Sequence, residues 1–344
     1  MSLEAIERLL SQKIGIDSQI IGTRKIAKAA ESRCSASGSP NLEAYFRLLQ
    51  SSPQEFEELV EQIVVPETYF FRDRKPFKFL MEYAQSHWLS RSKIRILSAP
   101  CSTGEEAYSI AIALLEAGLP THQFKIQAID ISKAAIAKAQ RAIYGKNSFR
   151  GEPWIDQTRY FEQTSDGHQV NERVRSLVHF RQSNLLAAFP VAQPEYDVIF
   201  CRNLLIYLES AACSQLMKTF DQLLLPEGLL FVGSAETNKV PSDRFTSLRE
   251  PFTFSYQKKT TQPAKPEPKA VGAFPQLQDL QAKVIERKTQ KSKADHQTAS
   301  MIVSTNAAPK SSFELAKQLA DAGEIEAAIE HCKVHLECDS VNPD

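Results

Sequence analysis

The chain has little that would place it at a metal, on nucleic acid or in a membrane. None of its apolar runs approaches the roughly 20 residues that a bilayer-spanning helix needs. Its six cysteines form no C-x-x-C pair and show no metal-ligand spacing with the seven histidines. Lys+Arg and Asp+Glu balance at 41 each, so no global field attracts nucleic acid or anionic lipid. We therefore expect no metal, no nucleic-acid partner and no membrane insertion. Because the N-terminus also lacks a basic segment followed by an apolar core, we expect a reducing, cytoplasmic location.

Glycine is scarce where a dinucleotide site would need it. The stretch Arg95–Ile110 runs from an apolar segment through small residues into a helical pattern, and only Gly104 remains of the three glycines of the dinucleotide fingerprint. Small residues let a ligand approach the backbone, and the first turn of the helix offers free N–H donors. Glu105 and Glu106 argue against a phosphate and for a ligand that carries hydroxyls or an ammonium group. An ordinary strand-to-helix turn is the alternative.

Two different patterns divide the chain before residue 258. Residues 1 to about 90 show helical spacing, and Ser52 followed by Pro53 predicts a helix start. From about residue 93, short apolar runs alternate with helical stretches, which is typical of a mostly parallel sheet covered by helices. The expected strands are Ile94–Ala99, Phe124–Ile129, Tyr196–Cys201 and Leu229–Gly233, and the expected helices are Glu106–Glu116, Lys133–Ala142 and Ser210–Leu224. The alternating segment Phe252–Tyr256 predicts a closing antiparallel edge strand.

An acidic residue ends the second expected strand. Asp130 stands 26 positions after Gly104, where a Rossmann-like fold binds the two ribose hydroxyls of an adenosine. Because the phosphate-binding glycines are missing, this pair of features favours an adenosine ligand without a pyrophosphate. S-adenosylmethionine fits, since Glu105 or Glu106 can accept its ammonium group. Taken alone, an Asp at the end of a strand is more often a helix cap.

Two further segments carry polar groups beside apolar ones. Tyr196–Leu208 runs from a buried strand into Arg202, Asn203 and Tyr207, at the edge where open α/β sheets bind ligands. Glu67–Asp73 combines an aromatic wall with Arg72. The alternative interpretation is that the aromatic residues belong to the core and the arginines are solvated charges.

The C-terminal part differs in composition from the rest. Residues 259–310 are too poor in large apolar residues to fold alone, and we expect a disordered linker. Residues 311–344 show two helical patterns around an Asp-Ala-Gly turn, a spacing that resembles a tetratricopeptide repeat and suggests a protein partner. An ordinary helical hairpin is the alternative.

Over about residues 1–258 the chain resembles the chemotaxis receptor glutamate methyltransferases, the CheR family. The matching motifs are Thr68–Asp73, Cys101–Glu106, Asp130–Ser132, Ala142–Tyr144, Phe200–Tyr207 and Gly233–Thr237. The resemblance implies an α/β fold: a Rossmann-like class I S-adenosylmethionine-dependent methyltransferase sheet over residues 89–258, with a β-subdomain at about 155–180, preceded by a small all-α domain over 1–88 and followed by the helical C-terminal tail. Pro66 stands where the family usually has Asn, and Pro100 replaces a usual Gly.

The resemblance also implies a set of site residues. The expected contacts to S-adenosylmethionine, whose product is S-adenosylhomocysteine, are Thr68, Arg72, Glu106, Asp130, Asn184, Leu185, Arg202 and Asn203. Arg72 and Tyr207 are expected near the transferred methyl group as catalytic residues. The segment Ser18–Arg33 is expected to form a basic helix beside the active site, where Arg24, Lys25, Lys28 and Arg33 attract an acidic receptor helix.

The implied reaction is methyl transfer to glutamate side chains of a methyl-accepting chemotaxis-type receptor, giving glutamyl methyl esters. Two other classes of function stay open at this point. One is a methyltransferase that acts on a different protein or on a small molecule. The other is a cofactor-binding scaffold whose C-terminal repeat recruits partners.

Overall fold

The computed structural model describes residues 2–151, 154–187 and 194–260. An N-terminal group of five helices comes first in the chain: α1 (Ser2–Ile14), α2 (Ser18–Ile21), α3 (Thr23–Ala36), α4 (Leu42–Ser51) and α5 (Pro53–Ile63). The predicted cap of α5 is confirmed, because the Ser52 side chain accepts a hydrogen bond from the Glu55 N–H (3.2 Å). The single basic helix expected over Ser18–Arg33 is wrong: Gly22, with φ +94°, separates α2 from α3.

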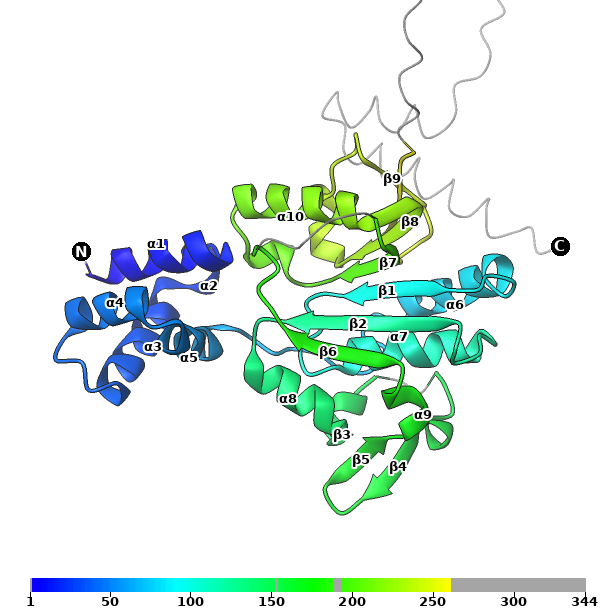
Figure 1. The fold of residues 1–344 in the computed structure, drawn as a ribbon, viewed down its shortest axis with the longest axis horizontal. Coiled ribbons are helices and arrows are strands. Elements are labelled where there is room, and N and C mark those ends of the chain that lie inside the picture. The colour runs from blue at the N-terminus through cyan, green and yellow to red at the C-terminus, as the bar shows by residue number, and fades with distance from the viewer. Residues whose placement is uncertain (1, 152–153, 188–193, 261–344) are drawn as a thin grey trace, which may run out of the picture. The chain divides into compact units, whose positions relative to one another are not determined.

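A seven-stranded sheet forms the middle of the molecule (Figure 1). Its strands are β1 (Ile94–Ser98), β2 (Phe124–Asp130), β6 (Val178–Gln182), β7 (Tyr196–Cys201), β8 (Leu224–Val232), β9 (Phe245–Ser247) and β10 (Ser255–Lys258). Their order is β6-β2-β1-β7-β8-β10-β9, and the first five run parallel. β7 is buried along its whole length, as expected for a strand covered on both faces. The predicted mostly parallel α/β sheet is confirmed.

The end of the sheet differs from the prediction. β10 pairs antiparallel with β8, as expected, but it begins only at Ser255 and lies inside the sheet, because β9 forms the edge. Phe252 and Phe254 have φ of +60° and +49°, so the backbone turns where the alternating sequence predicted a strand. Phe252 is 70% exposed, which explains why alternation misled here: its side chain faces solvent, away from the core.

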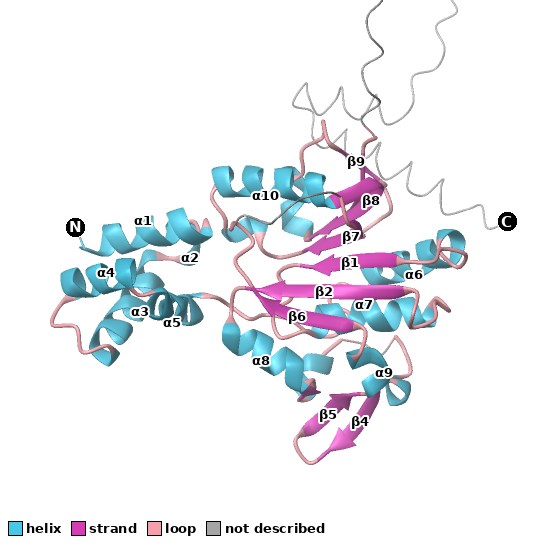
Figure 2. Cartoon of the chain, in the orientation of Figure 1, coloured by secondary structure: helices cyan, strands magenta, loops and turns pink. Residues whose placement is uncertain are grey.

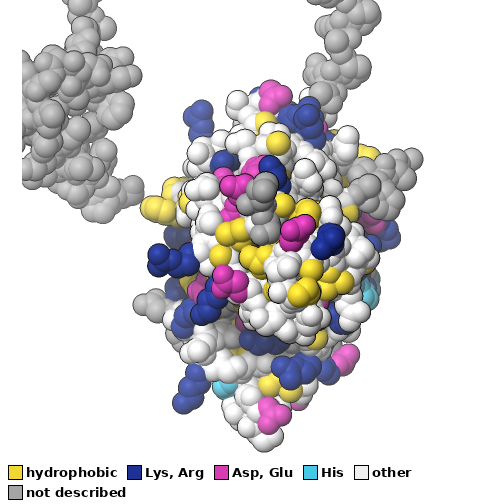
Figure 3. Space-filling view, turned by 90° about the vertical axis from the view of Figure 1, so that its left-hand side faces the viewer, with side chains coloured by type: hydrophobic (Ala, Val, Ile, Leu, Met, Phe, Trp, Pro, Cys, Tyr) yellow, Lys and Arg dark blue, Asp and Glu magenta, His cyan; other side chains and the backbone are white. Residues whose placement is uncertain are grey.

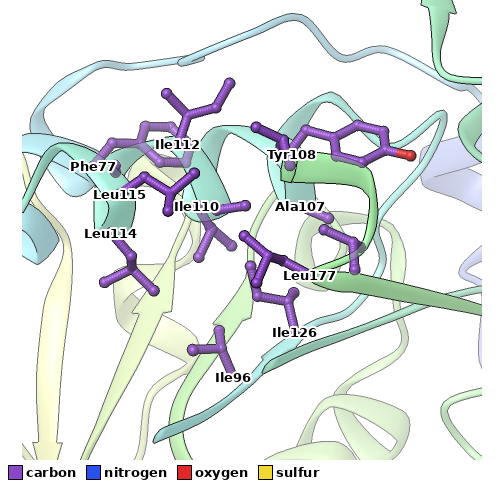
Figure 4. Packing of buried hydrophobic residues seen from close by; sticks show 14 of the residues in the cluster. Phe77, Ile96, Ala107, Tyr108, Ile110, Ile112, Leu114, Leu115, Ile126 and Leu177 are labelled. Carbon is purple, nitrogen blue, oxygen red and sulfur yellow. The ribbon is translucent and has the colours of Figure 1, made fainter. Parts of the chain in front are cut away.

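Helices cover both faces of the sheet (Figure 2). On one face pack α6 (Lys75–His87), α7 (Glu105–Glu116) and α8 (Lys133–Arg141), with the short α9 (Glu172–Arg175) beside them. Figure 4 shows Ile110 and Leu114 of α7 pointing toward Ile96 and Ile126 of the strands. Every residue of α7 except Glu116 is buried, which explains its almost continuous apolar sequence.

The opposite face is covered by α10 (Ser210–Leu223), and the N-terminal helices lie beyond the carboxyl ends of the parallel strands (Figure 1). Ile6 and Leu10 of α1 belong to the same buried cluster as Phe220 of α10 and Ile199 of β7. Helix α6 was assigned to the N-terminal helical domain by the predicted boundary at residue 88, yet its buried residues belong to the cluster of α7 on the other face. The group of N-terminal helices in this packing is therefore α1–α5.

A second sheet of three strands lies beside α8 and α9, in the order β3-β5-β4. Its strands are β3 (Ile143–Tyr144), β4 (Phe161–Thr164) and β5 (Gly167–Val170), all antiparallel. The β-subdomain predicted at 155–180 therefore needs new bounds. It recruits Ile143–Tyr144 from earlier in the chain, and Val178–Gln182 instead forms β6 of the main sheet.

Four short 3-10 helices complete the described part: η1 (Lys146–Phe149), η2 (Gln157–Arg159), η3 (Leu205–Tyr207) and η4 (Ser234–Lys239). Among the helices of this part, none combines the length and apolar character needed to cross a membrane. The linker predicted at 259–310, apart from its first two residues, and the hairpin predicted at 311–344 lie outside the described residues.

Candidate functional site

A pocket opens where the parallel strands β1, β2 and β7 end. The chain proceeds from β1 to β2 on one side, while β7 pairs with β1 on the other, and open α/β sheets bind ligands outside such a switch point. Residues after these three strands and residues of the N-terminal helices share the lining. The lining residues are Ile14, Ile16, Ile21, Ile63, Val64, Val65, Pro66, Glu67, Thr68, Arg72, Pro100, Cys101, Ser102, Glu106, Asp130, Ile131, Ser132, Ala135, Arg202, Asn203, Leu204 and Tyr207.

The loop after β1 depends on one glycine. Gly104 has φ +96°, and a Cβ at this position would lie 2.8 Å from Ala139 Cβ, so no other residue fits without a shift. Ser102 also adopts a left-handed backbone, with φ +48°, and its N–H donates to Asp130 Oδ2 (2.7 Å). The loop after β1 and the end of β2 are thus joined directly.

The two acidic residues that follow Gly104 point in different directions. Glu105 is buried away from the pocket, where its carboxylate accepts hydrogen bonds from Thr103 Oγ1 (2.6 Å) and Ser148 Oγ (2.9 Å). Glu106 lines the pocket and accepts from Ser98 Oγ (2.8 Å). Of the two carboxylates considered for an ammonium group, only Glu106 is available to a ligand in the pocket.

Asp130 lies at the end of β2 and is 7% exposed. Its Oδ2 accepts from the Ser102 N–H, and its Oδ1 accepts from the Ser132 N–H (2.9 Å). Burial raises the pKa of Asp130, and these backbone hydrogen bonds oppose that rise. The helix-cap interpretation of Asp130 is wrong, because the Ser132 side chain caps α8 by accepting from the Ala135 N–H (2.9 Å).

Arg202, directly after β7, joins three segments around the pocket. Its side chain is 1% exposed; Nη1 donates to Glu106 Oε2 (3.2 Å), and Nη2 donates to Asp73 Oδ2 (2.6 Å) and to the Arg72 carbonyl (3.1 Å). Burial raises the pKa of Glu106, and the charge of Arg202 is the largest influence that opposes it. The solvated-charge interpretation of Arg202 is therefore wrong.

The Thr68–Asp73 segment divides between core and pocket. Phe70 is buried, with its ring against those of Tyr144 and Phe161, so this part of the aromatic wall belongs to the core. Thr68 and Arg72 line the pocket, and Arg72 Nη1 donates to the Glu67 carbonyl (2.7 Å).

The loop after β7 is held by a carboxylate that is fully buried. Glu236 accepts hydrogen bonds from the N–H groups of Asn203 (2.9 Å), Leu205 (2.6 Å) and Gly233 (2.5 Å). Asn203 has φ +60°, a conformation that residues other than glycine keep only where the surroundings hold it. This loop continues into η3, whose last residue, Tyr207, lines the pocket.

Seven of the nine residues predicted for the cofactor and the catalytic step line this pocket. They are Thr68, Arg72, Glu106, Asp130, Arg202, Asn203 and Tyr207. Asn184 lies in a second cleft that shares Ile14 and Ile131 with the pocket, and its Nδ2 donates to the Lys13 carbonyl (2.6 Å). Leu185 is 8% exposed and packs in the core. The cofactor contacts of Asn184 and Leu185 stay predictions.

The four basic residues predicted for substrate recognition have different surroundings. Arg33 forms ion pairs with Glu55 and Glu58, and Lys25 Nζ donates to the Ile63 carbonyl (2.6 Å), where burial lowers the pKa of Lys25. Arg24 and Lys28 are exposed on α3. In Figure 3, which faces the N-terminal helices, most Lys and Arg side chains lie toward the border of the face, while apolar and acidic side chains lie nearer its middle.

The residues of the pocket fit S-adenosylmethionine. Two buried polar atoms of the lining, Ser102 Oγ and Arg202 Nε, have no hydrogen-bond partner within the described part of the chain. Buried polar atoms normally have such partners, and polar groups of a bound ligand would supply them. Asp130 and Glu106 add carboxylates for hydroxyl and ammonium groups. Sequence reasoning missed the apolar wall that Ile14, Ile16 and Ile21 provide. These isoleucines lie at the ends of α1 and α2 and between them, and no local pattern shows that this part of the chain reaches the edge of the sheet.

Comparison with known proteins supports the same assignment. Residues 66–253 match the family model described as CheR methyltransferase, SAM binding domain. The chain is 35% identical to a probable biofilm formation methyltransferase WspC of Pseudomonas aeruginosa, over 97% of this chain and 82% of that protein. It is 37% identical to chemotaxis protein methyltransferase 2 of the same species (56% of this chain, 70% of that protein) and 32% identical to the chemotaxis protein methyltransferase of Escherichia coli (59% and 72%).

Proposed function

Because the chain belongs to the CheR methyltransferase family, with S-adenosylmethionine as its cofactor, we propose that it methylates glutamate side chains of a chemotaxis-type receptor. The observation that carries the proposal is the pocket at the ends of β1, β2 and β7, where Asp130, the Glu106–Arg202 pair and Tyr207 meet. The products are glutamyl methyl esters and S-adenosylhomocysteine.

The chain's own carboxylates are suited to hold the cofactor. Each oxygen of Asp130 accepts one backbone N–H and keeps a second lone pair for a ribose hydroxyl. Burial raises the pKa of Glu106, and the charge of Arg202 opposes that rise and favours the carboxylate form, which can accept an ammonium group. When bound, S-adenosylmethionine supplies a methyl group on a positively charged sulfur.

The attacking group needs orientation rather than a base. A glutamate side chain has an unperturbed pKa of about 4.3 and is ionised at neutral pH. Within the described part of the chain, no histidine lines the pocket. Alignment and removal of water then supply most of the rate. The apolar wall of Ile14, Ile16 and Ile21 excludes water, while Arg72 and Tyr207 orient the carboxylate without a firm ion pair that would weaken the nucleophile.

The description of one relative suggests which process the receptor controls. The WspC protein matched over 97% of this chain is described as a probable biofilm formation methyltransferase. We extend that setting to this chain and propose a receptor whose methylation controls biofilm formation. Deletion of the gene should then change surface growth, and a strain that loses swimming chemotaxis alone would contradict this assignment.

Transfer of a labelled methyl group tests the proposed reaction. The protein is incubated with methyl-labelled S-adenosylmethionine and cytoplasmic fragments of its organism's receptors, and the product is then treated with base. We expect label on a receptor fragment that base releases as methanol, and loss of labelling when the acceptor glutamates are replaced by alanine. Base-stable label would indicate N- or C-methylation, and cofactor binding without transfer to any fragment would favour a scaffold.

A further inference from the structure

The turn between α1 and α2 pairs directly with the end of the loop that carries Tyr207. Ile16 and Leu208 form an isolated antiparallel bridge. The Asp17 N–H donates to the Tyr207 carbonyl (2.8 Å), and the Glu209 N–H donates to the Gly15 carbonyl (2.9 Å). Residues almost 200 positions apart in the chain thus share a short strand pairing at the pocket.

This pairing fixes the backbone of Tyr207. The Tyr207 N–H donates to the Leu204 carbonyl (2.9 Å), so the bond from Asp17 satisfies the remaining backbone group. Two contacts from outside the loop hold this turn: Glu236 accepts from the Leu205 N–H at its start, and the N-terminal segment pairs with its end. The bond from Asp17 reaches Tyr207 itself and so helps to fix where the Tyr207 ring lies in the pocket.

Asp17 belongs at the same time to helix α2. Its side chain accepts from the Gln19 N–H (2.9 Å) and caps the helix, while its own N–H reaches Tyr207. Helix α2 is followed directly by α3, which carries the exposed Arg24 and Lys28. A displacement of these two helices would therefore reach Tyr207 through Asp17, next to the Glu209–Gly15 hydrogen bond and the Ile16–Leu208 bridge.

The segment has no room to move sideways. Gly15 has φ +71°, and a Cβ there would lie within 2.5 Å of side-chain atoms of Leu186 and Ala212. Ser11 Oγ donates to Glu209 Oε1 (2.7 Å) on the same side. The turn is seated against the sheet domain by close packing as well as by hydrogen bonds.

We propose that Gly15–Asp17 is a positioning segment for Tyr207, through which a receptor helix engaged at α2 and α3 aligns the tyrosine for methyl transfer. The inference rests on the proposed function, in that Tyr207 acts on the receptor carboxylate. Asp17 and Gly15 are positioning residues and touch no reacting atom.

Two substitutions at one position isolate the critical bond. Asp17→Pro removes the N–H that reaches Tyr207 and is compatible with the backbone, since Asp17 has φ −86°. Asp17→Ala removes the same side-chain cap and keeps the N–H. We expect Asp17→Pro to lower kcat for the receptor fragment by about 10- to 100-fold relative to Asp17→Ala, as misplacement of a catalytic group does. The KM for the fragment should change by less than about threefold, because both variants keep Arg24 and Lys28 of α3, where the proposal places the receptor helix.

A double-mutant cycle shows whether the loss acts through Tyr207. In a Tyr207→Phe background, Asp17→Pro should cost less than about twofold more, because the hydroxyl that it misplaces is already gone. Equal losses in both backgrounds, or equal kcat for Asp17→Pro and Asp17→Ala, would overturn the proposal. Full activity of Tyr207→Phe would overturn it as well.

A second pair of variants and a readout without turnover complete the test. Gly15→Ala should reproduce the loss, whereas Gly38→Ala, at φ +72° with nothing within 4 Å of the added Cβ, should not. In the fluorotyrosine-labelled full chain, the ¹⁹F signal that Tyr207→Phe removes should shift in Asp17→Pro but not in Asp17→Ala. An unmoved signal overturns the positioning role even if no receptor is methylated, whereas a shifted signal in an enzyme without receptor activity contradicts only the proposed function.

Discussion

Replacement of Arg202 by methionine should destabilise the protein in a way that depends on pH. The arginine is 1% exposed and pairs with Glu106, which is 11% exposed, and with Asp73, which is 44% exposed. Removing one partner of a buried pair costs about 3–5 kcal/mol when the remaining charge is uncompensated. Because only Glu106 is well buried, we expect a loss near the lower end, about 3 kcal/mol in the free energy of unfolding.

The sign of the pH dependence follows from Glu106. Burial already raises the pKa of Glu106 in the folded protein, and the loss of Arg202 removes the largest influence that opposes it. A folded-state pKa above the unfolded value means that the folded state binds more protons, so stability falls as pH rises through that window. The deficit of Arg202→Met should therefore be larger at pH 8 than at pH 5.

Urea unfolding at several pH values measures this deficit, and two further variants interpret it. The double variant Arg202→Met/Glu106→Gln should recover at least about half of the loss, because the buried uncompensated charge is gone and Asp73, which also loses Arg202, is half exposed. Arg244→Met, which breaks the partly exposed pair with Asp221, should cost less than about 1 kcal/mol. A deficit that is independent of pH, or a double variant as unstable as the sum of the single ones, would refute this reasoning.

Three other expectations can be checked directly. Asp130→Asn should weaken S-adenosylmethionine binding by about 1–3 kcal/mol in calorimetry. Burial raises the pKa of Asp130 and the ribose contact uses the carboxylate, so the wild-type affinity should also fall as pH drops through that raised pKa. An affinity that is independent of pH would place the ribose elsewhere. Glu236→Gln should lower the free energy of unfolding by about 2–3 kcal/mol, since an amide nitrogen cannot accept the backbone N–H that it faces; unchanged urea unfolding would count against this role. A chain that ends after Thr260 should methylate a receptor fragment at a rate within about twofold of that of the full chain. A chain that ends after Tyr256 should be less stable, because it lacks Lys258, whose side chain donates to the carbonyl of Leu224.

Prediction from the sequence worked best where the chemistry is local. Asp130 and Arg202 each stand at the end of an apolar run, and parallel strands bring such ends to one edge, so both residues line the pocket. The strand expected at Phe252 failed because alternation cannot distinguish a strand from a turn with left-handed residues.

What could not be predicted depends on distant parts of the chain. The recruitment of Arg33 by Glu55, which withdraws one of the four basic residues from the surface, needs the packing of α3 on α5. Nothing near Ile16 indicates that it meets Leu208. Glu236 was recognised only as part of a motif, and its three backbone partners explain why a carboxylate is needed there.

The apolar cluster that the N-terminal helices share with the sheet and α10 limits how this enzyme can be recombined with its relatives. Side chains of α1, α5 and α10 fill a single apolar cluster with those of β1 and β7. A crossover at residue 64 would divide this cluster between two parents and leave mismatched volumes on each side of the join. Exchange of the N-terminal helices, whether by evolution or by design, therefore requires the residues that meet them, such as Leu208 opposite Ile16 and Ala212 beside Gly15, to change with them. Under the proposed function, receptor preference would then be inherited together with part of the catalytic domain.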